Sequence, residues 1–299
     1  MQQQGTMCTF DSKNSWVILS PIEQSIKSKI EAVGTPLKDW DIRINYGIKT
    51  GCNEAFIIST EKRNEILSNC KTEEECKRTA ELIRPILRGR DIKRYQFDWA
   101  GLYLIATFPS KHYDINDYQS VKHYLLSYGN GHGQELLEQT GATHIIDGKP
   151  IKSRKKTKNK WFETQDSISY WEDLLQPKIV WIELSDEPKF AISELMPLNT
   201  VFYLIGERIN DIIGMLNSTI YKWYFTHCIG TTSGVGTNRW LKYTIEQVPL
   251  IKHHIGISHI TEKIVNNEIS EELGQLEIDK ILFNILELTN DEINMIKNY

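Results

Sequence analysis

The chain has 299 residues, of which 40% are hydrophobic and 25% charged, a composition typical of globular proteins. No run approaches the ~18 consecutive apolar residues of a membrane helix, and the first residues have no basic stretch followed by an apolar one. We therefore expect neither a membrane span nor a signal peptide. The formal net charge is −4, but nine acids and three lysines follow Thr261, so that tail carries −6 and the remainder +2.

Five cysteines are present, and none forms a Cys-x-x-Cys pair. A structural zinc site needs closely spaced ligand pairs, so we expect reduced thiols and no metal. Reduced thiols and the lack of an apolar span predict a cytoplasmic location.

The first half of the chain alternates between helix-like and strand-like segments. Residues 21–33 repeat apolar side chains at helical spacing and precede Gly34, a helix stop. Alternating or short apolar runs predict strands at 40–46, 55–58 and 102–107, and helical spacing predicts helices at 61–69, 72–83 and 116–127.

The second half begins with three short apolar segments at 178–184, 189–193 and 200–205, predicted to be strands of one sheet. A helix is predicted at 210–225, and everything from 257 onward has a helical pattern. Thr289 and Glu292 have the spacing of a capping box. The irregular mixture predicts an α+β fold with a lead-in at 1–16, a mixed sheet-and-helix domain at 17–256 and a helical C-terminal segment at 257–299.

Motifs bear on two catalytic possibilities. An adenine methyltransferase needs a Pro-Pro-aromatic loop to hold a flipped base, and no Pro-Pro pair occurs. A Mg²⁺-dependent nuclease needs an acid followed by Glu-x-Lys. Asp173, Glu187 and Lys189 fit that pattern, although such a match is frequent by chance. We expect no catalytic residue, and this nuclease is the alternative.

The first of three basic or polar segments is 84–95, where five bases accompany one acid. Arginine suits both phosphate and the guanine edge because its planar fork donates two parallel hydrogen bonds. The candidates for DNA contact are Arg88, Arg90, Lys93 and Arg94. The alternative is that some of these arginines pair with Asp91 or other nearby acids and fix the turn.

The second segment, 149–160, has seven bases and no acid, followed by Trp161 and Phe162. Such a run gains free energy by displacing counterions from DNA. The candidates are Arg154, Lys155, Lys156, Lys158 and Lys160. We predict that Lys155, Lys156 and Lys158 contact phosphates; the alternative is a solvated loop.

The third segment, 230–240, is rich in glycine and hydroxyl residues that can present amides and hydroxyls to phosphate. Thr232, Ser233 and Arg239 are its candidates. With Arg88, Arg239 is the best candidate for reading a base edge. The alternative is an ordinary mobile loop in which Arg239 covers Trp240.

Several blocks resemble the TaqI-like C-terminal specificity domain of adenine methyltransferases and fused type IIG restriction-modification enzymes. The resemblance runs from about Trp16 to the end of the chain. Its two specific blocks are 47–58, with Lys49, Thr50 and Asn53 as further DNA-contact candidates, and 83–95. The weaker elements are 160–163 with 176–181, and 216–218 ahead of Val248-Pro249.

The resemblance implies a domain that clamps double-stranded DNA and selects the sequence in which an adenine is flipped for a methyltransferase module. It also implies methyltransferase, and often nuclease, modules upstream on the same polypeptide. S-adenosylmethionine and Mg²⁺ are then expected in those modules and not in this chain. Because the sequence starts just before the first matched helix, we expect a domain cut out of a longer protein rather than a separate subunit. A non-DNA interaction scaffold is a third possibility.

Overall fold

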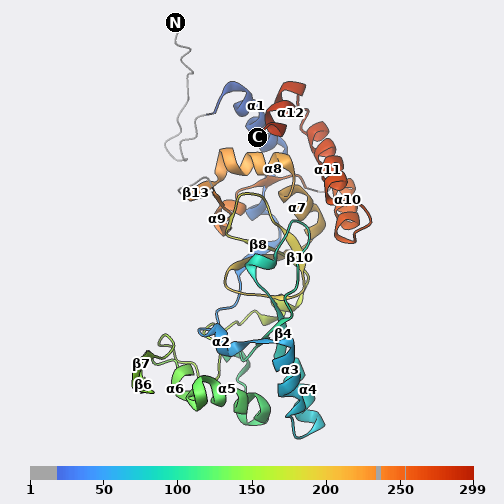
Figure 1. Cartoon of the computed structure of the whole chain (residues 1–299). Helices are drawn as coiled ribbons and strands as arrows, with labels where there is room; N and C mark the ends of the chain where they lie inside the picture. The colour runs from blue at the N-terminus through green and yellow to red at the C-terminus, as the bar shows by residue number, and fades with distance from the viewer. Residues whose placement is uncertain (1–18, 234–236, 253) are drawn as a thin grey trace.

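The computed structural model describes residues 19–233, 237–252 and 254–299. The predicted lead-in at 1–16 lies outside these residues. The molecule is elongated, with helices gathered at both ends and sheets between them (Figure 1). This mixture of helices and mostly antiparallel strands is the predicted α+β class.

The central sheet has the strand order β10 (Ala191–Ser193), β8 (Lys178–Ile182), β12 (Val201–Gly206) and β2 (Ile42–Tyr46). All neighbours are antiparallel. The predicted strands at 178–184, 189–193 and 200–205 therefore do belong to one sheet.

Both faces of this sheet are buried at its two central strands, β8 and β12. On β8, Ile179 and Trp181 pack into one hydrophobic core, and Val180 between them packs into a second. Successive side chains of a strand point to opposite faces, so a strand covered on both sides must be apolar throughout. This accounts for the apolar run from Ile179 to Ile182 in β8.

The first core lies between the central sheet and the helices at the top of Figure 1. Its helices are α1 (Pro21–Val33), α7 (Ile209–Leu216), α8 (Thr219–Tyr224), α9 (Lys242–Ile245), α10 (Ile255–Val265), α11 (Glu271–Ile285) and α12 (Asn290–Lys297). The short pair β1 (Thr35–Pro36) and β15 (Pro249–Leu250) closes it. The predicted capping box of Thr289 and Glu292 is present at the start of α12. The helices of the acidic tail also bury their apolar side chains, among them Ile257, Ile264 and Ile278, in this core.

The second core lies between the central sheet and a second sheet of order β11 (Met196–Pro197), β4 (Ile83–Leu87), β5 (Leu102–Ile105) and β3 (Ile57–Ser59). Here β11 pairs with β4 in parallel, and the other neighbours are antiparallel. The surrounding helices are α2 (Asn53–Phe56), α3 (Thr60–Ser68), α4 (Glu73–Leu82), α5 (Gln119–Gly131) and α6 (Gly133–Leu137).

Two small sheets project from one side of the molecule. They are the hairpin β6 (Thr143–Ile146) and β7 (Lys149–Lys152), and the sheet β13 (Thr231–Ser233), β14 (Thr237–Arg239) and β9 (Leu184–Ser185). In Figure 1 they lie below and above α2 on the left. No helix in the described ranges is long and apolar enough to cross a membrane.

Two predicted elements are wrong in detail. The predicted strand at 55–58 begins as the short helix α2 and becomes β3 only at Ile57. The predicted helix at 210–225 is two helices, because the chain leaves helical geometry at Ser218, whose hydroxyl accepts a hydrogen bond from the Tyr221 amide and caps α8.

Candidate nucleic-acid interface

The block 47–58 forms a tight loop ahead of α2. Gly47 lies against β11 and the residues after it, where any side chain would overlap the carbonyl of Leu198. Gly51 has a φ of +81°, in the left-handed region that favours glycine. The buried Thr50 hydroxyl donates to Asn53 Oδ1 at 2.7 Å and accepts from the Cys52 amide at 3.1 Å. Two of the predicted contact residues, Thr50 and Asn53, therefore shape this loop.

The block 83–95 continues from β4 into a single 3-10 turn, Gly89–Asp91. Arg88 Nε and Nη2 donate to the two carboxylate oxygens of Asp91 at 2.7 and 2.8 Å. These hydrogen bonds raise the pKa of Arg88. The structure thus gives Arg88 the acidic partner that the sequence left open, and the pair fixes the direction of the guanidinium.

The two blocks meet at one cleft of about 830 Å³, and an adjoining hollow of about 320 Å³ lies over the loop of the first block. Asn53, Glu54 and Asn199 line both. Arg88 and Arg90 enter the larger cleft from the second block, and Lys49 lines the smaller hollow. Tertiary structure therefore brings residues some 40 positions apart to one concave surface.

The cations around the cleft fall into two groups. Arg88 is paired with Asp91, and Arg239 on β14 is paired with Glu183, which lines the cleft. Arg90 and Lys49 are exposed, and neither forms an ion pair within the part of the chain that the structure describes. Unpaired, exposed cations can neutralise phosphate without first breaking an internal ion pair.

The basic run 149–160 also divides into two kinds of residue. Its lysines are all exposed, and none forms an ion pair with a described residue. They are Lys149, Lys152, Lys155, Lys156, Lys158 and Lys160. These lysines face solvent, and the run is anchored beside the smaller hollow by Arg154, whose side chain donates to the carbonyl of Thr50, a residue that lines the hollow. This arrangement is compatible with the predicted phosphate contacts.

Arg154 is different and requires a correction. Its side chain is 5% exposed and donates to the backbone carbonyls of Leu137, Thr50, Glu163 and Trp161 at 2.6–2.9 Å. Burial lowers its pKa to about 10. Every nitrogen of the guanidinium is engaged inside the protein, so Arg154 holds the loop in place and is no longer a candidate for DNA contact.

Arg94 is likewise engaged within the protein. Its Nη2 donates to the Asn217 carbonyl at 2.7 Å, and its Nε lies 3.4 Å from a carboxylate oxygen of Glu271 on α11. The Asn217 side chain in turn brackets Phe190, accepting from its amide at 3.1 Å and donating to its carbonyl at 2.9 Å. Asn217 belongs to the Leu-Asn-Ser element at 216–218, one of the weaker parts of the family resemblance. These hydrogen bonds show that Asn217 holds Phe190 beside the break between α7 and α8.

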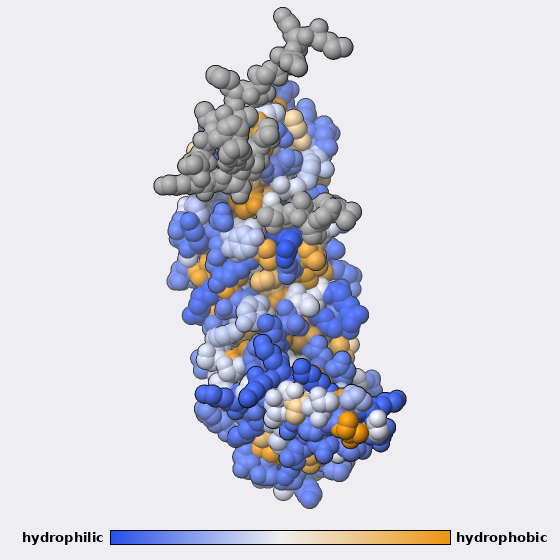
Figure 2. Space-filling model, turned by 90° about the vertical axis from the view of Figure 1, so that its left-hand side faces the viewer, coloured by the Kyte–Doolittle hydropathy of each residue, from blue (hydrophilic) through white to orange (hydrophobic). Residues whose placement is uncertain are grey.

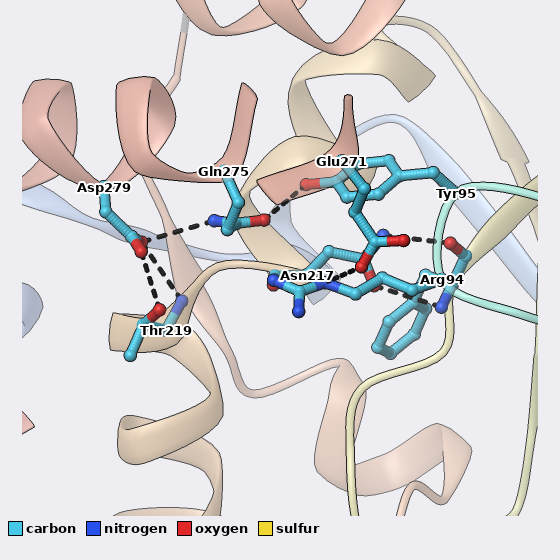
Figure 3. Close-up of polar contacts among 8 residues, drawn as sticks. Arg94, Tyr95, Asn217, Thr219, Glu271, Gln275 and Asp279 are labelled. Carbon is cyan, nitrogen blue, oxygen red and sulfur yellow. Dashed lines mark hydrogen bonds and ion pairs between the residues drawn. The ribbon is translucent and has the colours of Figure 1, made fainter. Parts of the chain in front are cut away.

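Tyr95 continues this network into the C-terminal helices (Figure 3). Its hydroxyl donates to Gln275 at 2.7 Å, and Gln275 donates to Asp279 at 3.3 Å. Asp279 accepts from the amide and hydroxyl of Thr219 at 3.1 and 2.6 Å. The turn of block 83–95 is thereby tied to α11 and to the start of α8.

The remaining predicted residues are more peripheral. Lys93 is paired with Asp98, and both side chains are largely exposed. Thr232 and Ser233 lie on β13, opposite Asn238 and Thr237 of β14. The predicted loop residues 234–236 between these strands lie outside the described residues.

The two acids of the nuclease alternative are engaged in separate ion pairs, and Lys189 is exposed. Asp173 is paired with Arg43 of β2, and Glu187 with Lys222 of α8. Among the described residues no group of three or more His, Cys, Asp or Glu side chains is placed to hold a metal.

Sequence reasoning missed Glu183, Asn199 and Thr200, which line the cleft. They follow β8 or precede β12, and no local motif marks them, because only strand pairing brings them beside Arg88. Figure 2 looks onto the side that carries α2, β6–β7 and β13 in Figure 1, and this face is largely hydrophilic.

Comparison with known proteins identifies the family of this chain. A solved structure described as the type IIG restriction endonuclease BpuSI is similar, with a TM-score of 0.46 and 10% identity, over 89% of this chain and 32% of that one. The chain thus spans about a third of that protein's length. No curated protein matches. The model of the TaqI-like C-terminal specificity domain matches residues 84–250, more than half of the chain, and the chain therefore belongs to that family.

Proposed function

We propose that this chain recognises a specific sequence in double-stranded DNA on behalf of a restriction-modification enzyme. Membership of a family of specificity domains supports this function. The observation that carries it is the cleft shared by blocks 47–58 and 83–95, beside which lie exposed lysines without acidic partners among the described residues. Phosphate contacts supply most of the affinity of such proteins, and base-edge contacts supply the sequence preference.

The residues divide between these two tasks. Lys155, Lys156 and Lys158 are the proposed phosphate contacts, because no described acid neutralises them. Arg90 is the proposed residue for base-edge contact at the cleft. Its side chain is exposed and forms no ion pair among the described residues, and it lies on the 3-10 turn Gly89–Asp91. Only Nε and Nη2 of Arg88 bind Asp91, so its Nη1 group is free of that contact. Arg88 therefore remains a candidate for base-edge contact, with its guanidinium held in a fixed orientation by Asp91.

We further propose that recognition positions a target adenine for an N6-adenine methyltransferase module outside this chain. S-adenosylmethionine and Mg²⁺ would then be bound by catalytic modules of the same parent polypeptide. The sequence supports this division, because it lacks the Pro-Pro-aromatic loop that holds a flipped adenine. Incubation of the chain with labelled S-adenosylmethionine, Mg²⁺ and duplex DNA should give neither methyl transfer nor cleavage.

Salt-dependent binding tests the phosphate contacts. Changing Lys155, Lys156 and Lys158 to Ala should weaken binding to every duplex about equally. The log–log salt slope should fall by roughly 1 for each lost contact, hence by about 3. Fluorescence anisotropy over a salt series measures the slope.

The matched control changes three exposed lysines elsewhere, Lys71, Lys77 and Lys280, to Ala. Lys77 lies on α4 and Lys280 on α11, which are on the right of Figure 1, away from the hairpin. An equal change of slope in both triple variants would show that the basic run has no special role. Absence of any salt-dependent binding by the wild type would refute DNA recognition itself.

A further inference from the structure

The hairpin of β6 and β7 projects from the lower left of the molecule in Figure 1. Its strands are joined by Asp147 and Gly148, with φ values of +50° and +74°. Two consecutive positive φ values are typical of the two-residue turn whose twist matches that of paired strands, and Asp-Gly is a preferred sequence for it. A side chain at Gly148 would meet no atom within 4 Å, so the tip stands in open space.

The two faces of the hairpin differ in burial. Thr143 lies opposite Lys152, and Ile145 opposite Pro150, so these four side chains share one face. All four are exposed, and Ile145 is exposed to 72%. On the other face Ile146 is buried and fastens the hairpin to the protein. The free face therefore presents a large apolar side chain to solvent.

The charge around this face is strongly positive. Lys149 and Lys152 lie on β7 itself, and the four exposed lysines from Lys155 to Lys160 follow directly. Between residues 139 and 162 the only acid is Asp147, a residue that this turn favours. An exposed apolar side chain surrounded by positive charge is suited to binding a polyanion that also carries apolar groups.

The base of the hairpin is held firmly. Arg154 bonds four backbone carbonyls there, one of them in the loop that borders the cleft. His144 Nε2 lies 2.7 Å from Glu138 Oε1, and the Ser153 amide donates to the Ala142 carbonyl at 2.8 Å. A rigid base fixes the direction of the hairpin relative to the cleft, so little conformational freedom is lost on binding.

We propose that this hairpin enters the major groove of duplex DNA and that Ile145 packs against the C5-methyl group of a thymine. The inference rests on the proposed function and assigns one recognition element to it. The major groove admits a two-stranded β-ribbon, and thymine is the one base that presents a methyl group there. The flanking lysines would meet the phosphates on either side.

Uracil substitution isolates the methyl contact whatever sequence the protein recognises. Duplexes are selected from a random library by binding to the full chain, and the selected pool is amplified once with thymine and once with uracil in its place. Dissociation constants are measured for wild type, Ile145→Ser and the matched control Ile255→Ser. Ile255 is 82% exposed on α10, so neither substitution disturbs a core.

Wild type and Ile255→Ser should bind the uracil pool more weakly, by about fourfold for each methyl group that Ile145 covers. Ile145→Ser should lose that difference while keeping the wild-type melting temperature. If Ile145→Ser retains the wild-type ratio between the two pools, the groove contact of Ile145 is wrong even though sequence recognition stands. If selection enriches no sequence, the proposed function fails, and the groove contact fails with it.

Discussion

Replacing Arg154 by Met tests whether this residue of the basic run serves the fold or the DNA. The substitution keeps a long side chain but removes the donors that bind four carbonyls. The Thr50 carbonyl keeps a bond from the Gln165 amide, and the Glu163 carbonyl keeps one from the Gln139 side chain. The carbonyls of Leu137 and Trp161 lose the donor that Arg154 supplied.

Each buried polar group left without a partner costs about 1–3 kcal/mol, so two of them cost about 2–6 kcal/mol. The variant recovers the desolvation cost of the guanidinium, the cost that lowers the Arg154 pKa to about 10. We therefore expect a loss of about 2–4 kcal/mol of unfolding free energy, near the lower end of the range. For a chain of this length that corresponds to a fall in Tm of about 3–6 °C.

Urea denaturation followed by circular dichroism measures the loss, and Lys155→Met is the matched control. Lys155 is the exposed neighbour, so its substitution should leave the unfolding midpoint unchanged and lower only the salt slope of DNA binding. The reasoning would be refuted if Arg154→Met kept the wild-type midpoint and lowered the salt slope by roughly 1, since that is the behaviour of a phosphate contact.

Three further predictions concern stability. Burial raises the pKa of Glu292, but hydrogen bonds from Lys29, Ser25 and the adjacent helix cap outweigh it and hold the pKa at about 2. Glu292→Gln should therefore destabilise the protein at neutral pH, and its deficit against wild type, measured by urea unfolding, should shrink as pH falls from about 4 toward 2. Burial lowers the pKa of Lys178 to about 8, so stability should rise from pH 8 toward about 10, and Lys178→Met should abolish that rise in urea titrations. Asn217→Ala leaves the Phe190 amide without its acceptor and should cost about 1–3 kcal/mol in the same assay; an unchanged midpoint would contradict the bracing role of Asn217.

The local structure follows closely from the sequence. The helix at Pro21–Val33, the capping box at Thr289 and the three strands of the central sheet were predictable, because capping and apolar periodicity act between residues a few positions apart. The α+β class follows from the same patterns. The break at Ser218 was not predictable from periodicity, because the bonds that brace it come from Phe190 on a distant segment.

The sequence by itself determined where positive charge is concentrated, and tertiary structure decided which of those charges are available. Arg88 finds its acid three residues away, a possibility that the sequence already contained. The partners of Arg94 and Arg239, Glu271 and Glu183, are distant along the chain, and the carbonyls that bind Arg154 come from three separate segments, around Thr50, Leu137 and Trp161. A basic side chain is neutralised or buried by whatever the fold places within a few ångströms of it. Sequence spacing therefore cannot separate these arginines from the exposed Arg90 and the lysines of the hairpin.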